Sequence, residues 1–265
     1  MSDADLDDTP GAEDGDDAPG AGSARRPSVA VFRPADERID AAAAHLESLG
    51  ADPVPDPMLA VEPTGAVPSD APFVVLTSKT GVELAAAAGW DPGDAVLATI
   101  GPATAAAARA AGWTVDVVPD EYTSAGLVAA LADRVAGDRV EVARSDHGSD
   151  VLLDGLRAAG AEPTETVLYR LTRPPEAGES AELAAAGELD AAAFTSSLTV
   201  EHFLAAAAER GVRDAAIEGL DSAVVGAIGA PTAETAADRG LDVDVVPDDA
   251  EFEALAAAVV DAATE

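Results

Sequence analysis

The stretch IGPATAAAARAAGWTVDVVPD, residues 100–120, returns later in the chain as IGAPTAETAADRGLDVDVVPD, residues 228–248. At an offset of 128 residues the two segments are identical at 12 of 21 positions. Several of the identities are Gly, Thr, Pro and Val, so the abundance of alanine does not explain the match. The chain therefore contains an internal duplication.

The duplication extends beyond this pair. FVVLTSKTGVELAAA from Phe73 is echoed by AAFTSSLTVEHFLAAA from Ala192, and a weaker pair begins at Val31 and Val142. Short apolar runs alternate with alanine-rich stretches of helical periodicity, which predicts βα units around parallel sheets. The expected strands are 28–33, 73–77, 95–100, 114–118, 139–144, 190–195, 223–228 and 242–246.

Composition limits the classes of function. The 265 residues, 48% of them hydrophobic, can form one large or two small domains, and the absence of cysteine excludes disulfides, thiolate metal sites and a cysteine nucleophile. A net charge of −35 argues against nucleic acid and anionic membranes as partners. An acidic chain with a single lysine is expected of a protein that works in concentrated salt, where charges are screened over about 3 Å at 1 M.

Residues 1–27 are acidic, rich in Gly and Pro, and contain no apolar segment typical of a secretory signal. We expect them to form a disordered extension. We also expect a cytoplasmic protein that is a monomer.

Hydroxyl groups and helix N-termini follow the expected strands. The segments concerned are Thr77-Ser78, 101–104, 144–146, 195–197 and 229–232. Because the carboxyl ends of parallel strands share one edge of a sheet, these groups should line a cleft suited to carboxylates or phosphates. Ser and Thr after a strand are also ordinary helix N-caps, so each of them alone is weak evidence for a ligand site.

Other kinds of site have little support. The chain has no GxGxxG, GxxxxGK[ST] or GxSxG motif, and its three histidines show no metal-binding spacing, so neither metal nor cofactor is expected. Tyr169 lies in 161–174, the second of two extended segments bounded by prolines; the first is 51–63. Its phenol could donate a proton in a cleft, or its ring could simply pack beneath a linker.

Taken in order, the motifs resemble one known family. The set L-T-S, I-G-x-x-T-A with G-x-x-x-x-V-V-P, V-x-R, G-A-E-P-x-E-x-x-x-Y-R, and then F-T-S with I-G-x-P-T-A is similar to uroporphyrinogen-III synthases across residues 28 to about 260. Each motif is weak alone, but their order and spacing are specific. The chain departs from the family at Lys79 and Ser197, where proline is frequent.

The resemblance implies a fold. The family has two similar α/β lobes, with parallel sheets flanked by helices, joined by a two-stranded β ladder. In this chain, 28–50 with 175–265 would form the outer lobe and 64–160 the inner lobe. Segments 51–63 and 161–174 would form the ladder.

The resemblance also implies a reaction. Members cyclise the linear tetrapyrrole hydroxymethylbilane to uroporphyrinogen III, with inversion of ring D and loss of water, without metal or organic cofactor. Tyr169 matches the tyrosine proposed to assist departure of the hydroxyl. Thr104, Thr232, Ser78 and Ser196 match positions expected to hold the substrate carboxylates.

The substrate would carry eight carboxylates, so an acidic protein needs local cations to bind it. Arg33, Lys79, Arg144 and Arg170 fall at strand ends or in the second crossing. We expect the first three to contact substrate. Two alternatives remain open at this point: a two-lobe protein that binds an anionic small molecule without chemistry, and a degenerate sensor region of a regulator.

Overall fold

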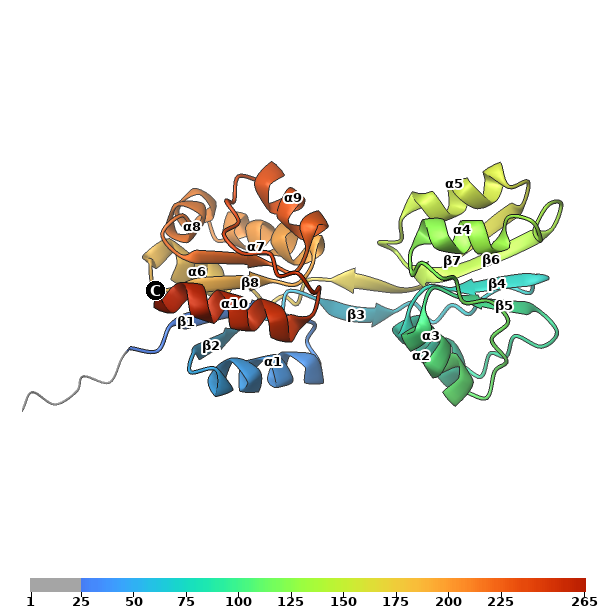
Figure 1. Cartoon of the computed structure of the whole chain (residues 1–265), viewed down its shortest axis with the longest axis horizontal. Helices are drawn as coiled ribbons and strands as arrows, with labels where there is room; N and C mark the ends of the chain where they lie inside the picture. The colour runs from blue at the N-terminus through green and yellow to red at the C-terminus, as the bar shows by residue number, and fades with distance from the viewer. Residues whose placement is uncertain (1–24) are drawn as a thin grey trace, which may run out of the picture.

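The computed structural model describes residues 25–265, which form two α/β lobes joined by a narrow connection (Figure 1). Most of the expected acidic extension lies outside the described residues. Arg25 and Arg26, which we assigned to that extension, contact the outer lobe. Arg25 pairs with Asp190 at 2.9 Å and Arg26 with Asp52 at 3.0 Å.

The outer lobe has a parallel sheet covered on both faces. Its strands are β1 (Ser28–Phe32), β2 (Asp52–Pro55), β8 (Ala191–Phe194) and β9 (Val224–Ala227), in the order β2-β1-β8-β9. Its helices are α1 (Glu37–Ser48), α6 (Glu179–Ala186), α7 (Ser197–Glu209), α8 (Arg213–Leu220), α9 (Ala230–Asp238) and α10 (Phe252–Thr264). Val29 and Val31 pack against α1 and α10, whereas Ala30 and Phe32 pack against the opposite helix layer. Alternate residues of one strand thus enter two cores.

The inner lobe repeats this plan. Its strands are β3 (Ala60–Pro63), β4 (Phe73–Leu76), β5 (Val96–Thr99), β6 (Arg139–Ser145) and β7 (Glu162–Thr172), in the order β3-β7-β6-β4-β5. Its helices are α2 (Lys79–Ala87), α3 (Pro102–Ala110), α4 (Ser124–Leu131) and α5 (Asp150–Ala158). One face of the sheet packs against α2 and α3, and the other against α4 and α5. The predicted fold class, two α/β lobes with a two-stranded connection, is confirmed.

The connection is shorter than the ladder that we expected. Segment 51–63 contains two strands, and only β3 pairs with β7, in antiparallel register; β2 lies parallel to β1 in the outer sheet. Between these strands the buried carboxylate of Asp56 accepts hydrogen bonds from the backbone N–H groups of Gly178 and Ser180. This contact holds the turn in the outer lobe, so that pairing with β7 begins only after it. The limits that we gave for the lobes stay a prediction.

The carboxyl ends of both parallel sheets face the space between the lobes. β7 runs parallel to β6 in the inner sheet and then leaves that sheet toward the outer lobe (Figure 1). At the end of β1, Pro34 forms a bridge with Leu59, just before β3 begins. The loops that we expected to line a cleft therefore lie at facing edges.

Two expected strands, 114–118 and 242–246, form only single bridges to their neighbours. In the first, the side chain of Asp116 accepts the N–H of Leu97 at 2.8 Å, and Asp244 makes the same contact in the second copy at 2.8 Å. In each copy the aspartate side chain thus accepts a backbone N–H that would otherwise be free to pair with a neighbouring strand. The duplication conserves even this irregular detail.

Candidate functional site

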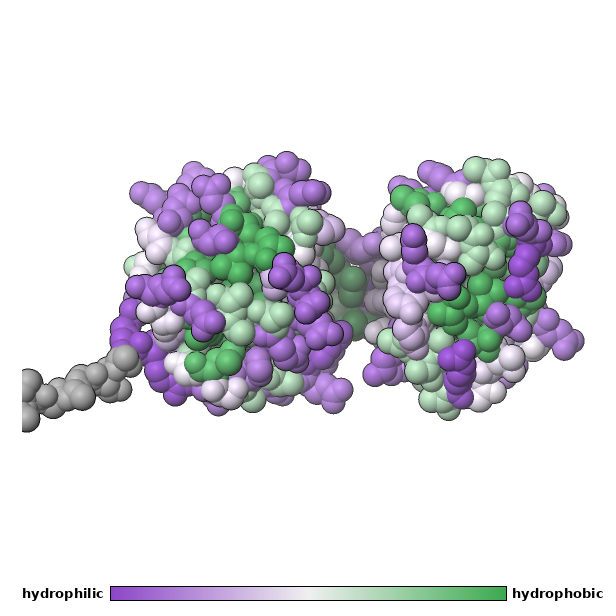
Figure 2. Space-filling model, viewed as in Figure 1, coloured by the Kyte–Doolittle hydropathy of each residue, from purple (hydrophilic) through white to green (hydrophobic). Residues whose placement is uncertain are grey.

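The candidate site is the gap between the two lobes. Figure 2 shows the lobes standing apart, with the connection visible between them. Because the carboxyl edges of both sheets face this gap, helix N-termini from both lobes border it. Backbone N–H groups at such N-termini favour bound anions.

Tyr169 is buried near the carboxyl end of the inner sheet, at an irregularity in β7. The register between β6 and β7 shifts after Arg144, so that Ser145 lies opposite Tyr169. As a result, the consecutive residues Leu168 and Tyr169 are both buried in the apolar cluster beneath α2, where strict alternation would have separated them. The phenol of Tyr169 donates a hydrogen bond to Oγ of Ser78 at 3.0 Å. Two residues that we predicted for the site are thus in direct contact.

Ser78 is also the N-cap of α2, and its Oγ accepts the N–H of Gly81 at 2.9 Å. Since the oxygen accepts from both Gly81 and Tyr169, its own O–H is the group left to donate outward. Ser196 caps α7 in the same way, with Thr199 completing a capping box. That copy has no tyrosine partner for its serine, so the chemistry of the two lobes differs here.

The repeated IGxxTA elements form the N-termini of α3 and α9. Both helices begin after a glycine, Gly101 or Gly229, and neither has a side-chain cap. Thr104 and Thr232, which we predicted to bind carboxylates, are each only 4% exposed. The uncapped backbone amides are therefore better placed than the threonine hydroxyls to meet a ligand.

Arg144, which we predicted to contact substrate, is engaged by groups of its own lobe. Its side chain is 4% exposed, its Nε donates to Glu165 at 2.6 Å, and its guanidinium also donates to the carbonyl of Ser149 at 2.6 Å. The guanidinium packs so closely on Gly148 that a Cβ at that position would lie 2.3 Å from the side chain. These contacts hold the β6–α5 loop, and a substrate contact of Arg144 stays a prediction.

Arg33 and Lys79 border the gap from opposite lobes. Arg33 lies with its guanidinium 5.1 Å from the ring centre of Phe252, and burial lowers its pKa. Its Nε is buried and has no hydrogen-bond partner among the described residues. Lys79 is exposed at the start of α2 and pairs with Glu83 at 3.4 Å.

Arg38, which sequence reasoning missed, is a further cation at the gap. Asp36 is the N-cap of α1, and its carboxylate accepts both the backbone N–H and the side chain of Arg38. The bond to Asp36, above all, raises the pKa of Arg38; burial opposes this rise, and Tyr169 of the inner lobe adds to it. The signal in the sequence was an Asp two residues before an Arg at an expected helix start.

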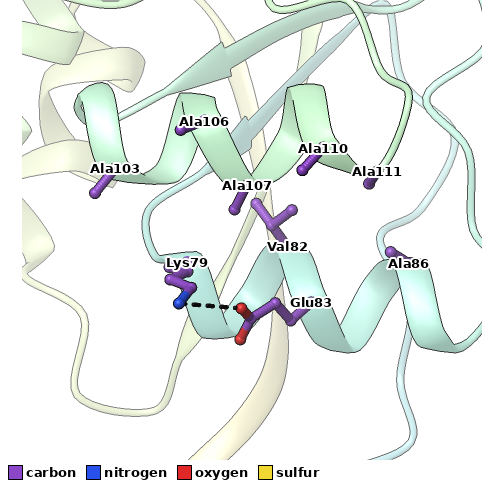
Figure 3. Close-up of a pocket in the computed structure, with 9 residues that line it drawn as sticks. All are labelled: Lys79, Val82, Glu83, Ala86, Ala103, Ala106, Ala107, Ala110 and Ala111. Atoms are coloured by element: carbon purple, nitrogen blue, oxygen red, sulfur yellow. Dashed lines mark ion pairs between the residues drawn. The ribbon is translucent and has the colours of Figure 1, made fainter.

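A groove between α2 and α3 begins at the same edge (Figure 3). Its volume is about 610 Å³, and most of its lining is alanine, from Ala103 and Lys79 at one end to Ala111 and Ala86 at the other. Alanine-rich helices look alike in sequence, so nothing there marks these two. Within residues 25–265, no group of three or more metal-ligating side chains is placed to hold a metal ion.

The fold and site define a two-lobed α/β protein in which uncapped helix N-termini of both lobes border the gap. Residues 40–257 match the family model described as uroporphyrinogen-III synthase HemD. The chain belongs to the uroporphyrinogen-III synthase family.

Individual relatives agree with this placement. A protein of Methanothermobacter thermautotrophicus is 38% identical over 152 residues, which are 56% of this chain and 59% of the relative. A uroporphyrinogen-III synthase of Synechococcus elongatus is 28% identical over 178 residues, 61% of this chain and 67% of its own. The sequence matches thus span about three fifths to two thirds of these relatives.

Solved structures share the fold. Uroporphyrinogen III synthase of Thermus thermophilus, in a mutant form, gives a TM-score of 0.61 at 22% identity, covering 86% of this chain and 95% of that one. The enzyme of Helicobacter pylori gives 0.57 at 14% identity, covering 87% and 96%. The two-lobe architecture is therefore common to all three.

Proposed function

We propose that the protein is a uroporphyrinogen-III synthase, which cyclises hydroxymethylbilane with inversion of ring D and loss of water. The observation that carries this proposal is the bond from the phenol of Tyr169 to Ser78, at an edge bordered by uncapped helix N-termini. Membership of the family supports it.

In this proposal the two lobes hold one substrate. The amides at the N-termini of α3 and α9 bind acetate and propionate carboxylates, with Ser196 beside them and Arg33 and Lys79 supplying positive charge. Thr104 and Thr232 lie buried in the first turns of these two helices. Binding from two walls fixes the geometry of ring closure, which matters because the substrate also closes unaided to the wrong isomer.

The chemical step needs one proton donor. Ser78 donates its free O–H to the departing hydroxyl while it accepts the phenol proton of Tyr169, so the leaving group departs as water. The azafulvene cation that remains is attacked through a spiro-pyrrolenine intermediate, and closure releases a proton that restores the pair. No metal or organic cofactor takes part in these steps.

The test is the isomer composition of the product. Freshly prepared hydroxymethylbilane is incubated with the full chain, the products are oxidised, and type III and type I porphyrins are separated. We expect type III to dominate and to rise with enzyme concentration, because the enzyme competes with spontaneous closure to type I. Type I alone, at the level of heat-denatured controls, would reject the synthase and favour a binding protein without chemistry.

We further propose a cytoplasmic monomer that works in concentrated salt. The excess of 50 acidic over 15 basic residues supports the habitat. No helix within residues 25–265 has both the length and the apolarity to cross a membrane. Light scattering on the purified protein checks the oligomeric state.

Salt should stabilise this protein strongly. Self-repulsion among its acidic side chains acts over about 10 Å at 0.1 M salt but only about 3 Å at 1 M. We expect the melting temperature, followed by circular dichroism, to rise by roughly 10 °C between 0.1 and 2 M KCl, which corresponds to a few kcal/mol for a chain of this size. A melting temperature independent of KCl would remove the case for a saline habitat.

A further inference from the structure

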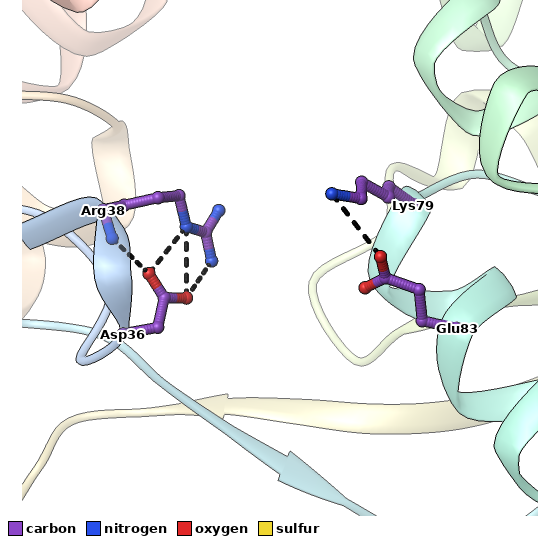
Figure 4. A network of polar contacts seen from close by, with 4 residues as sticks. All are labelled: Asp36, Arg38, Lys79 and Glu83. Atoms are coloured by element: carbon purple, nitrogen blue, oxygen red, sulfur yellow. Dashed lines mark hydrogen bonds and ion pairs between the residues drawn. The ribbon is translucent and has the colours of Figure 1, made fainter. Parts of the chain in front are cut away.

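Four charged residues form two ion pairs that face each other across the gap. Arg38 and Asp36 belong to the first turn of α1 and its cap in the outer lobe, and Lys79 and Glu83 to α2 in the inner lobe. Figure 4 shows the Arg38 and Lys79 side chains extending toward each other from the two lobes. Each cation is held by a carboxylate of its own lobe, and these four side chains form no pair across the gap.

Both pairs are exposed to solvent. The four side chains are between 40% and 65% exposed, and exposed ion pairs contribute little to stability. Lys79 meets Glu83 at 3.4 Å, a loose contact. Asp36 holds Arg38 more closely, through both carboxylate oxygens, so an incoming carboxylate replaces Glu83 at small cost and has to compete with Asp36 for Arg38.

Lys79 lies next to the proposed chemical centre, because it directly follows Ser78, whose Oγ accepts the hydrogen bond from the phenol of Tyr169. Arg33, whose guanidinium lies 5.1 Å from the ring centre of Phe252, adds a second positive charge in the outer lobe; burial and then the charge of Arg38 lower its pKa. The whole chain has 15 basic residues against 50 acidic ones, so several basic residues at the gap make this region more positive than the rest of the protein.

We propose that Arg38 and Lys79 form a clamp, in which substrate carboxylates displace Asp36 and Glu83 and draw the two lobes together over Tyr169. The clamp rests on the proposed function and adds Arg38 as a substrate-binding residue. In the ligand-free protein, Asp36 holds Arg38 and Glu83 holds Lys79. Neither cation then pairs with another acidic side chain of the lobes within residues 25–265. Ligand binding and lobe closure are therefore one event.

The first test uses Michaelis constants. Arg38→Gln and Lys79→Gln should each raise KM for hydroxymethylbilane roughly fivefold, as expected for loss of one exposed charge contact. Asp36→Asn combined with Glu83→Gln should lower KM, because the competing carboxylates are gone while Asn keeps the N-cap of α1. Arg157→Gln, which breaks an exposed pair with Asp154 on α5, is the control of equal charge change.

The second test measures the distance between lobes. Because the chain has no cysteine, Ala44→Cys on α1 and Ala87→Cys on α2 permit spin labelling at two exposed sites. Uroporphyrin III, which carries eight carboxylates but cannot react, serves as the probe. We expect it to shorten the distance in the otherwise unaltered chain and in the Arg157→Gln background, and to leave it unchanged when Arg38→Gln and Lys79→Gln are combined.

Two outcomes overturn the clamp. Equal shortening in all three backgrounds, with KM unaffected by Arg38→Gln, removes these cations from binding. A rise in KM for Asp36→Asn with Glu83→Gln shows instead that the lobes close by pairing with each other. Both outcomes differ from failure of the proposed function, in which the unaltered chain yields no type III product whatever the distances show.

Discussion

Replacing Tyr169 by Phe should lower kcat for type III product about 10- to 100-fold, while KM and folding change little. The variant keeps the ring that packs beneath α2 and loses only the hydroxyl that donates to Ser78. A loss of this size corresponds to about 1–3 kcal/mol in the barrier, which is the scale of one proton-donating contact. Initial rates of type III formation, with melting curves run in parallel, measure it.

The duplication supplies a control for this prediction. Ser78→Ala and Ser196→Ala each remove an N-cap, from α2 and α7, and should each cost about 1 kcal/mol of stability. Only Ser78→Ala should reduce kcat, and combining it with Tyr169→Phe should add little, because the two residues act as one donor. Equal rates for Tyr169→Phe and the unaltered chain would take the pair out of the mechanism.

The periodicity of the chain predicted most of the fold. Six of the eight expected strands are present as β1, β4, β5, β6, β8 and β9, because buried parallel strands leave continuous apolar runs in the sequence. The other two, 114–118 and 242–246, carry an aspartate whose carboxylate takes a strand donor, and such a contact has no apolar signature. The way in which the ends and the middle of the chain form separate lobes came from the family resemblance alone.

The sequence predicted which residues belong to the candidate site better than it predicted the contacts that they make. Sequence placed Tyr169 and Ser78 at the cleft but could not show their bond, which depends on the register shift in β7. Arg144 resembled a ligand because it ends a strand, yet its partner Glu165 lies 21 residues away on β7. Arg38 was missed because Asp36 and Arg38 read in sequence as an ordinary helix N-cap with a neighbouring charge, and only the structure places this pair opposite Lys79 across the gap.

The central claim is that the uncapped N-termini of the repeated elements hold the substrate. Gly101 precedes α3 with an extended backbone (φ −173°), which any residue adopts, and an added Cβ would meet Tyr122 at an ordinary 3.4 Å. Gly101→Ser would supply the missing N-cap. The serine Oγ would accept a hydrogen bond from a backbone N–H in the first turn of α3, and that N–H would no longer be free to bind a substrate carboxylate. The same change should therefore stabilise the helix by a few tenths of a kcal/mol and weaken binding.

The most direct measurement is KM for hydroxymethylbilane in Gly101→Ser, with Gly101→Ala as the matched variant that has the Cβ but no hydroxyl. We expect KM to rise about tenfold in the serine variant, the effect of losing one hydrogen bond to a carboxylate, and to change little in the alanine variant. Equal KM values in Gly101→Ser and Gly101→Ala, with the serine cap confirmed by a higher melting temperature, would show that these amides do not hold the substrate.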